Sequence, residues 1–379
     1  MLQPHPESPF SQQSIDRLHR RDTLRTASHL AMTALLGVAP FVSVYTQDVY
    51  ANMEVQANAK IDIERLYEPL DPDNSNVAIV ALHGFGNYDS KEVAKYLGPA
   101  AQIFQDGQRW SVKYGNAFLE EQAITDKIIE LSKAYNVDTI SLLGYSGGGA
   151  ISMRVAEQLM RQTDLDISLI TAISTPDGAQ GLRQLQRDEI EVSQAIELIP
   201  GAKYSSFVRY IGEMYFRRDR YDSGSPIERL SDAFTVHQSV LEDLQKKDMP
   251  GTWLLTNQVN AITSARIENR IENMATMEGE TPPVIVYLGT AKPGYDYVVN
   301  DKLSGSNICG YAHQHDMSCI RHNVPGAVHT RPDLANDAYL QTAEAIGPMV
   351  RHAIAHRTPN TSLDENTGKD IPAPQPGVL

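Results

Sequence analysis

The segment Leu142–Ala150 constrains the fold of this chain more than any other feature of its sequence. An apolar run ends there in Gly-Tyr-Ser-Gly-Gly, with Ser146 at the centre, and a helical pattern begins directly afterwards. The flanking Gly144 and Gly148 leave room for a turn that is too tight for a Cβ atom. This G-x-S-x-G pattern predicts a strand, a sharp turn and a helix, with the Ser146 hydroxyl presented at the apex as a nucleophile. A phosphate-binding loop would instead need a lysine that does not follow these glycines.

Short apolar runs alternate with longer helical patterns along most of the chain. Continuous apolar runs such as Val77–Leu82 are typical of strands that are buried on both faces. The alternation predicts an α/β fold, with a mostly parallel central sheet and helices on both faces. One more strand, of uncertain place, is expected at Trp253–Thr256. The other expected strands lie at 61–67, 77–82, 110–114, 139–143, 167–173, 283–288 and 317–321, and the expected helices at 90–104, 116–134, 150–161, 267–277 and 334–355.

The pattern divides the chain into four parts. A basic and apolar N-terminal segment occupies residues 1–51, and a Pro-, Asn- and Gly-rich tail, expected to be disordered, occupies 358–379. Between them, 52–177 and 281–357 form the α/β core. Residues 178–280 are more polar, helical in character and rich in aromatic residues, and they predict a helical cap inserted into the core.

The N-terminal segment bears on localisation. Four arginines lie between residues 17 and 25, and residues 26–47 contain no Asp, Glu, Lys or Arg. A basic flank before an apolar run of bilayer length predicts a signal peptide or membrane anchor, with membrane association through 26–47 and the core outside the cytoplasm. The alternative is a first helix docked on the domain. Cys309 and Cys319 would form a disulfide in an exported protein and two buried thiols in a cytosolic one.

Composition excludes some partners. The formal net charge is -14, and no basic patch follows the first 25 residues, so nucleic acid is not an expected ligand. Two cysteines cannot form a metal site alone. The run His313-Gln-His315-Asp316 offers a metal site only as a weaker alternative to solvent-exposed histidines. We therefore expect no metal site.

The segment His83-Gly84-Phe85-Gly86 directly follows a predicted buried strand. An acyl-transfer enzyme needs two N–H donors for the oxyanion of its tetrahedral intermediate. The backbone N–H groups of Phe85 and Gly147 are the candidates. We interpret His83 itself as structural.

The general base and the acid that orients it should follow later strands. His329 lies between the last predicted strand and the last helix, and His322 is the second choice of base. Asp296, in the loop after strand 283–288, is the first choice of acid. Asp177, in the loop after strand 167–173, is its main rival, and Asp301 is the third candidate.

In this order, the oxyanion loop, elbow, helical insertion, acid and late histidine resemble the α/β-hydrolase superfamily over roughly residues 60–356. The resemblance implies a serine esterase or lipase-like enzyme with the triad Ser146, His329 and Asp296. It implies no cofactor and a small-molecule or lipid acyl ester as substrate. The 33-residue connection from Asp296 to His329 is long for this family. An acyltransferase or peptidase on the same fold, or a non-catalytic binding protein, remains an alternative.

Overall fold

The structure is a computed structural model of the whole chain, and it describes residues 45–359 apart from several short gaps. The N-terminal segment up to residue 44, and with it most of the predicted signal or anchor, lies outside the described residues, as does the tail from residue 360. In the described part of the chain, no helix is both long and apolar enough to cross a bilayer. The gaps fall at 54–59, 87–88, 115–118, 217–224, 245–251 and 291–295, at 297, 328 and 330–331, and at nine positions between 185 and 197.

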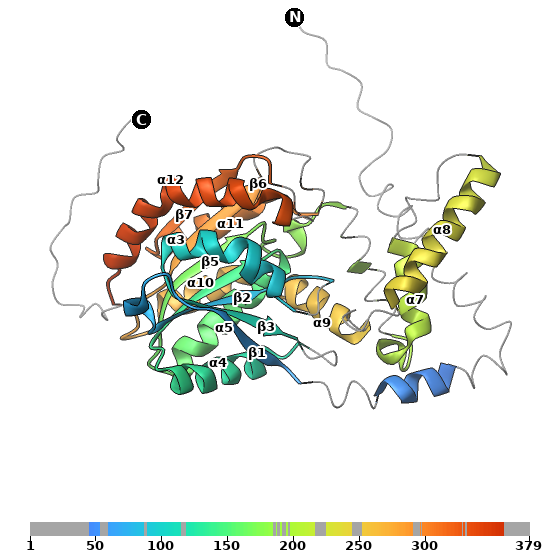
Figure 1. Ribbon diagram of the computed structural model, residues 1–379, viewed down its shortest axis with the longest axis horizontal. Coiled ribbons are helices and arrows are strands. Elements are labelled where there is room, and N and C mark those ends of the chain that lie inside the picture. The colour runs from blue at the N-terminus through green and yellow to red at the C-terminus, as the bar shows by residue number, and fades with distance from the viewer. Residues whose placement is uncertain are drawn as a thin grey trace, which may run out of the picture.

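A single twisted sheet of seven strands forms the centre of the molecule (Figure 1). Its strand order is β1-β3-β2-β4-β5-β6-β7, and every neighbouring pair is parallel except β1 with β3. The strands are β1 Asp62–Tyr67, β2 Val77–Leu82, β3 Gln108–Lys113, β4 Thr139–Tyr145, β5 Asp166–Ile173, β6 Val284–Thr290 and β7 Cys319–Val324. Seven of the eight expected strands are confirmed, with bounds that differ by at most three residues.

Helices cover both faces of this sheet, as the sequence predicts. On one face α4, α5, α10 and α11 pack over a core that includes Trp110, Ile128 and Tyr287, and on the other α3 and α12 pack over Phe104 and Tyr339. Every residue of β2 and β6 is buried, which explains why their sequences are continuously apolar. The helices are α3 Gly98–Phe104, α4 Glu121–Tyr135, α5 Gly147–Gln162, α10 Ile267–Ala275, α11 Asp301–Gln314 and α12 Asn336–Ala355.

Two features differ from expectation. The strand predicted at Trp253–Thr256 is wrong, because these residues belong to helix α9, Thr252–Thr263. Helix α11 is unexpected, and together with β7 it fills the long connection between Asp296 and His329.

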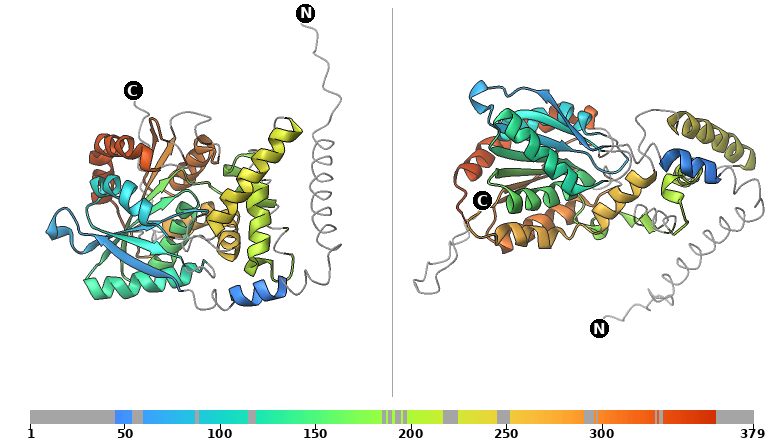
Figure 2. Two further views of the ribbon diagram at one scale, coloured as in Figure 1. Left: turned by 45° about the vertical axis from the view of Figure 1, so that its right-hand side comes forward. Right: turned by 90° about the horizontal axis from the view of Figure 1, so that it is seen from below.

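Three helices of the predicted insertion lie toward one side of the core (Figures 1 and 2). They are α7 Ser206–Phe216, α8 Pro226–Leu244 and α9, and we call them the cap helices because α9 contacts the loops at the carboxyl ends of the strands. Helix α10 also falls within 178–280, yet it packs against α5 in the core. Residues 45–53 form a helix at the foot of α7, far from the sheet (Figure 2).

Candidate active site

Ser146 occupies a strained turn between β4 and α5. Its φ of 55° and ψ of -130° lie in a region that residues with side chains rarely adopt. The turn is tight because a Cβ atom on Gly144 would lie 2.4 Å from Gly149 Cα, and one on Gly148 would lie 2.2 Å from the carbonyl oxygen of Leu82. The structure therefore confirms the strand, turn and helix around Ser146, and the glycines are required because the backbone segments nearly touch.

The structure brings the two predicted partners of Ser146 together with it. His329, in the loop after β7, has its Nε2 atom 2.9 Å from Ser146 Oγ, and its Nδ1 atom is 2.7 Å from Asp296 Oδ2. All three side chains are buried. A carboxylate only accepts hydrogen bonds, so this geometry places the proton on Nδ1 and turns the Nε2 lone pair toward the serine hydroxyl.

Asp296 is held by the backbone around it. Its Oδ1 atom accepts hydrogen bonds from the N–H groups of Val298 and Val299, at 2.8 and 2.7 Å. The side chain of Arg183, in the segment after β5, donates to the Asp296 carbonyl oxygen at 2.6 Å. A carboxylate with this many fixed donors cannot rotate freely, so it also fixes the plane of the His329 ring.

The two rival acids have other partners. The carboxylate of Asp177 accepts hydrogen bonds from Ser304 Oγ and Asn307 Nδ2, which ties the loop after β5 to α11. Asp301 accepts from Tyr287 Oη and from the backbone and side chain of Thr290. Burial, together with the nearby charge of Asp296, raises the pKa of Asp301. His322, the second choice of base, is exposed on the edge strand β7.

The oxyanion loop approaches the start of α5 closely. A Cβ atom on Gly84 would lie 2.5 Å from the Gly147 nitrogen, so only glycine permits this contact. Gly147 is the first residue of α5, where backbone N–H groups have no partner within the helix. Phe85, which follows Gly84 in the oxyanion loop, has a half-exposed side chain. The two predicted donor segments thus lie side by side next to Ser146.

Gln258 of α9 contributes a contact that the sequence did not reveal. Its Oε1 atom accepts a hydrogen bond from the Gly86 N–H at 2.9 Å, and the glutamine is buried. Ile262, one turn further along α9, lies close to Gly147. A Cβ atom on Gly147 would be 2.6 Å from Ile262 Cδ1. Nothing in the sequence singles out Gln258, because Thr256, Asn257 and Asn260 are polar residues of the same segment.

His83 is a neutral, buried neighbour of the three residues. Its ring lies edge-on to Tyr145 with the ring centres 5.4 Å apart, and Tyr145 in turn lies 5.6 Å from the His329 ring. Burial, with a smaller effect of His329, lowers the pKa of His83 to about 3. A neutral imidazole places no positive charge beside His329, in agreement with the structural role expected for His83.

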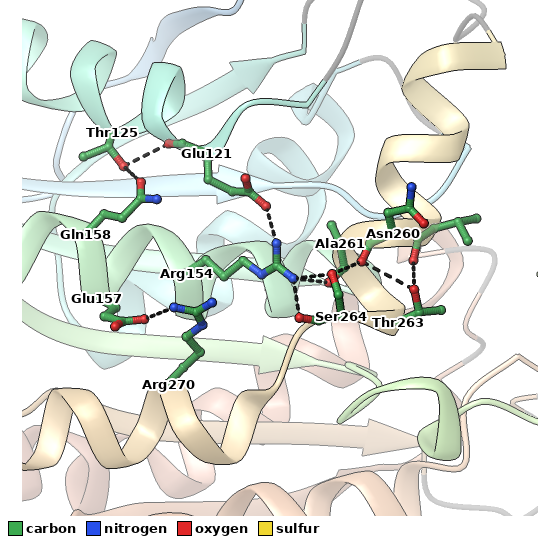
Figure 3. Close-up of polar contacts among 11 residues, drawn as sticks. Glu121, Thr125, Arg154, Glu157, Gln158, Asn260, Ala261, Thr263, Ser264 and Arg270 are labelled. Atoms are coloured by element: carbon green, nitrogen blue, oxygen red, sulfur yellow. Dashed lines mark hydrogen bonds and ion pairs between the residues drawn. The ribbon is translucent and has the colours of Figure 1, made fainter. Parts of the chain in front are cut away.

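Arg154 joins α9 to the core (Figure 3). From α5, its guanidinium donates to the carbonyl oxygen of Ser264 at 2.6 Å and to its hydroxyl at 2.8 Å, just beyond the end of α9, and it pairs with Glu121 of α4 at 2.8 Å. Carbonyl groups at a helix C-terminus lack partners within the helix, and a cation satisfies them well. One side chain thus connects three helices, and its own helix begins at the elbow.

Glu157, one turn further along α5, makes a second joint of this kind with α10. Arg270 and Asn273 of α10 donate to its carboxylate, and Arg161 of α5 adds a third partner. Burial alone would raise the pKa of Glu157, but the hydrogen bonds and charge of Arg270 and the other partners lower it. Figure 3 shows both joints on the same side of α5.

The metal alternative finds no support in the described residues, which contain no cluster of three or more His, Cys, Asp and Glu side chains suited to an ion. His313 instead lies 3.3 Å from the carbonyl oxygen of Cys319. Cys309 and Cys319 form a disulfide that joins α11 to β7. Of the two arrangements that the sequence left open for these cysteines, the structure has the disulfide.

The strand order fixes the positions of all these groups. The oxyanion loop follows β2, the serine follows β4, the acid follows β6 and the histidine follows β7, so each lies at the carboxyl end of a parallel strand. A nucleophile elbow on the central strand of such a sheet defines the architecture. The chain has the α/β-hydrolase fold.

Known proteins add little to this assignment. No family model and no curated protein matches the sequence. Among solved α/β-hydrolase structures, an esterase from Exiguobacterium antarcticum is 12% identical with a TM-score of 0.42, and the match covers 78% of this chain and 96% of the esterase. A lipase-esterase related protein from Clostridium acetobutylicum is 13% identical with a TM-score of 0.44, covering 76% and 99%. A proline iminopeptidase from Mycobacterium smegmatis is 11% identical with a TM-score of 0.40, covering 78% and 95%.

Proposed function

We propose that this α/β-hydrolase-fold protein is a serine hydrolase that cleaves carboxylic esters, with Ser146 as nucleophile, His329 as general base and Asp296 as the acid that orients it. The observation that supports this most is the continuous hydrogen-bonded relay from Ser146 Oγ through His329 to Asp296 at a strained elbow. Strain of this kind is retained where it serves function. Helices α7, α8 and α9 of the predicted insertion would form the cap that shapes access to the site.

The proposed reaction gives each group a defined role. His329 Nε2 takes the proton of Ser146 Oγ while that oxygen attacks the ester carbonyl carbon. The backbone N–H groups of Phe85 and Gly147 hold the oxyanion. His329 then gives the proton to the leaving alcohol, which departs and leaves an acyl-serine. Water, activated by the same histidine, attacks the acyl-serine and releases the carboxylic acid.

A fluorophosphonate probe tests the nucleophile directly, because it phosphonylates a serine only when a nearby base activates that serine. We expect one adduct on Ser146 in the folded chain, none in Ser146→Ala, and none in urea-unfolded chain. Ser152, which is buried in the same helix and donates to the carbonyl oxygen of Gly148, provides the matched variant Ser152→Ala, which should label normally. An intact chain that takes up no probe would exclude the proposed nucleophile.

Nitrophenyl esters with acyl chains from acetyl to dodecanoyl test the reaction class. Ester hydrolysis that disappears in Ser146→Ala supports an esterase. Probe labelling without ester hydrolysis would point to the acyltransferase or peptidase alternatives, and the absence of both would leave the non-catalytic binding protein.

A further inference from the structure

The cap helices and the segments next to them carry an unusual amount of exposed apolar surface. Nine of the sixteen large apolar side chains that are exposed in the described chain belong to residues 45–53 and 198–241, although these segments form a small part of it. Single exposed apolar residues are normal on a soluble protein, but a concentration of them marks an interaction surface. The nine are Tyr50, Met53, Leu198, Ile199, Phe207, Ile227, Leu230, Phe234 and Leu241.

Four of these residues form a stripe along α8. Ile227, Leu230, Phe234 and Leu241, which we call the α8 stripe, are 83%, 74%, 61% and 40% exposed. At 100° of rotation per residue they fall within about 60° of the helix circumference. The side of α8 that packs on α7 lies beside the stripe and includes Val236 and Val240, which are buried, and His237, whose ring is hydrogen-bonded to Tyr210 of α7. The α8 stripe is therefore additional to the contact that holds α8 on α7.

The helix of residues 45–53 shows where the N-terminal apolar run ends. Tyr45 Oη donates to the carbonyl oxygen of Pro200 at 2.7 Å, and Asn52 Nδ2 donates to Ser206 Oγ at 2.9 Å. Asp48 accepts a hydrogen bond from Ser205 Oγ at 2.8 Å, beside the first turn of α7. A carboxylate is favourable at a helix N-terminus. The 45–53 helix is therefore fixed to α7.

This attachment places the end of the apolar run at the cap helices. Residues 26–44 contain no charged side chain and lead directly into Tyr45. A run of about 20 such residues has the length that crosses or enters a bilayer. Because Tyr45 is tied to Pro200, a run embedded in lipid would hold α7 and α8 at the lipid surface. In that position the α8 stripe would enter the boundary between headgroups and acyl chains, as the apolar side of an interfacial helix does.

We propose that the outer side of α8 is a lipid-binding surface, which docks on the same bilayer that receives residues 26–44. The proposal does not depend on the chemistry of Ser146, so the two can fail separately. It commits the α8 stripe to acyl chains and headgroups, and not to a second copy of the chain.

Fluorescent labels on the full-length protein test this surface. Leu230→Cys carries a nitrobenzoxadiazole label on the α8 stripe. Leu70→Cys is the matched control, because Leu70 is 76% exposed but follows β1 at the other end of the sheet. The native cysteines are joined in a disulfide, so the label reacts only at the new site when no reductant is present. Circular dichroism confirms that both variants fold.

On vesicles of phosphatidylcholine with a minority of phosphatidylglycerol, we expect the emission of the label at position 230 to shift to the blue. Lipids carrying a nitroxide on the acyl chain should then quench it, while the label at position 70 keeps its emission. Three results would overturn the proposal. They are a protein that does not sediment with vesicles, a bound protein whose label at position 230 behaves like that at position 70, and a label already shielded without lipid. In the last case, a doubled molecular mass would identify a second copy, and a monomer would identify residues 26–44 as the cover.

Discussion

The sheet and the cap helices place their apolar side chains differently. Strands β2 and β6 have all their residues buried between two layers of helices, and the catalytic candidates lie at the ends of such strands. Helix α8 buries one side on α7 and leaves Leu230 and Phe234 mostly exposed. A sheet covered by helices on both faces can hold its atoms within a fraction of an ångström. A helix with one exposed apolar side is instead suited to contact with another molecule or a membrane. In our proposals, the core carries the catalytic residues and the cap carries the lipid-binding surface.

The largest expected effect separates the core acids from one another. Replacement of Asp296 by asparagine should lower kcat by about 10⁴-fold, because an amide favours the wrong tautomer of His329. Asp177→Asn is the matched control, since Asp177 is a buried acid one loop away whose partners are on α11. Initial rates on a nitrophenyl ester at fixed pH measure both. Equal losses in the two variants would show that the acid has been assigned to the wrong residue.

The joint between core and cap gives the next effect. Arg154→Met removes the guanidinium that links α9 to α4 and α5, and leaves Glu121 without its cation. Breaking charged, partly buried hydrogen bonds of this kind costs about 2–3 kcal/mol of unfolding free energy. The control Arg161→Met, on the same helix but with a side chain 54% exposed, should cost less than about 1 kcal/mol. Urea unfolding monitored by circular dichroism measures both, and indistinguishable midpoints would mean that Arg154 does not hold α9.

The unfolding free energy at low pH tests the burial of His83 in the core. The pKa of His83 is lowered to about 3 in the folded chain, while the unfolded chain takes up the proton below about 6.5. The unfolded state then binds more protons, so this residue's contribution is complete above pH 6.5 and falls as the pH drops from there toward 3. At pH 5 the loss is about 2 kcal/mol. His83→Gln should remove that part of the difference between unfolding free energies at pH 8 and pH 5. A difference as large as in the wild type would place the acid sensitivity elsewhere.

The smallest effect concerns the contact that crosses from cap to core. Gln258→Leu removes the acceptor for the Gly86 N–H and should lower kcat about 10-fold, the value of one hydrogen bond, with little change in KM. Gln258→Glu retains an acceptor at the same distance and should restore most of the rate. Gln258 acts through the loop, as a positioning residue. If both variants lost activity equally, or if the loss appeared in KM alone, the contact would have another role.

The central sheet can be predicted well from the sequence, because strands buried on both faces have continuously apolar sequences. An apolar run such as Val284–Leu288 is compatible with few structures other than a buried strand. A serine among glycines between a strand and a helix is compatible with even fewer structures other than the sharp turn. Ser146, His329 and all three candidate acids follow the carboxyl ends of parallel strands for the same reason, since parallel strands gather their following loops at one edge. The choice of Asp296 among three acids, however, required the distances.

The open part is harder to predict for physical reasons. Trp253–Thr256 includes residues that favour strands, but it lies in α9, where Leu254, Leu255 and Thr256 are buried and the helix contacts α5, and such packing overrides local preference. Helix α11 contains Gly305 and Gly310, two serines and one asparagine, and it has no clear apolar periodicity, so its sequence gives no helical signal. Its side chains instead serve Asp177 through Ser304 and Asn307, a role that becomes visible only once the chain is folded.

The spacing of the three site residues along the chain has a consequence for synthesis. His329 bonds to Ser146 across 183 residues and to Asp296 across 33. A chain that emerges amino end first, from a ribosome or through a membrane pore, presents its serine elbow long before β7 brings the histidine. Until then the elbow has no base and cannot attack an acyl group. The proposed enzyme would therefore be inactive during its synthesis and translocation, and would become active only when β7 joins the sheet.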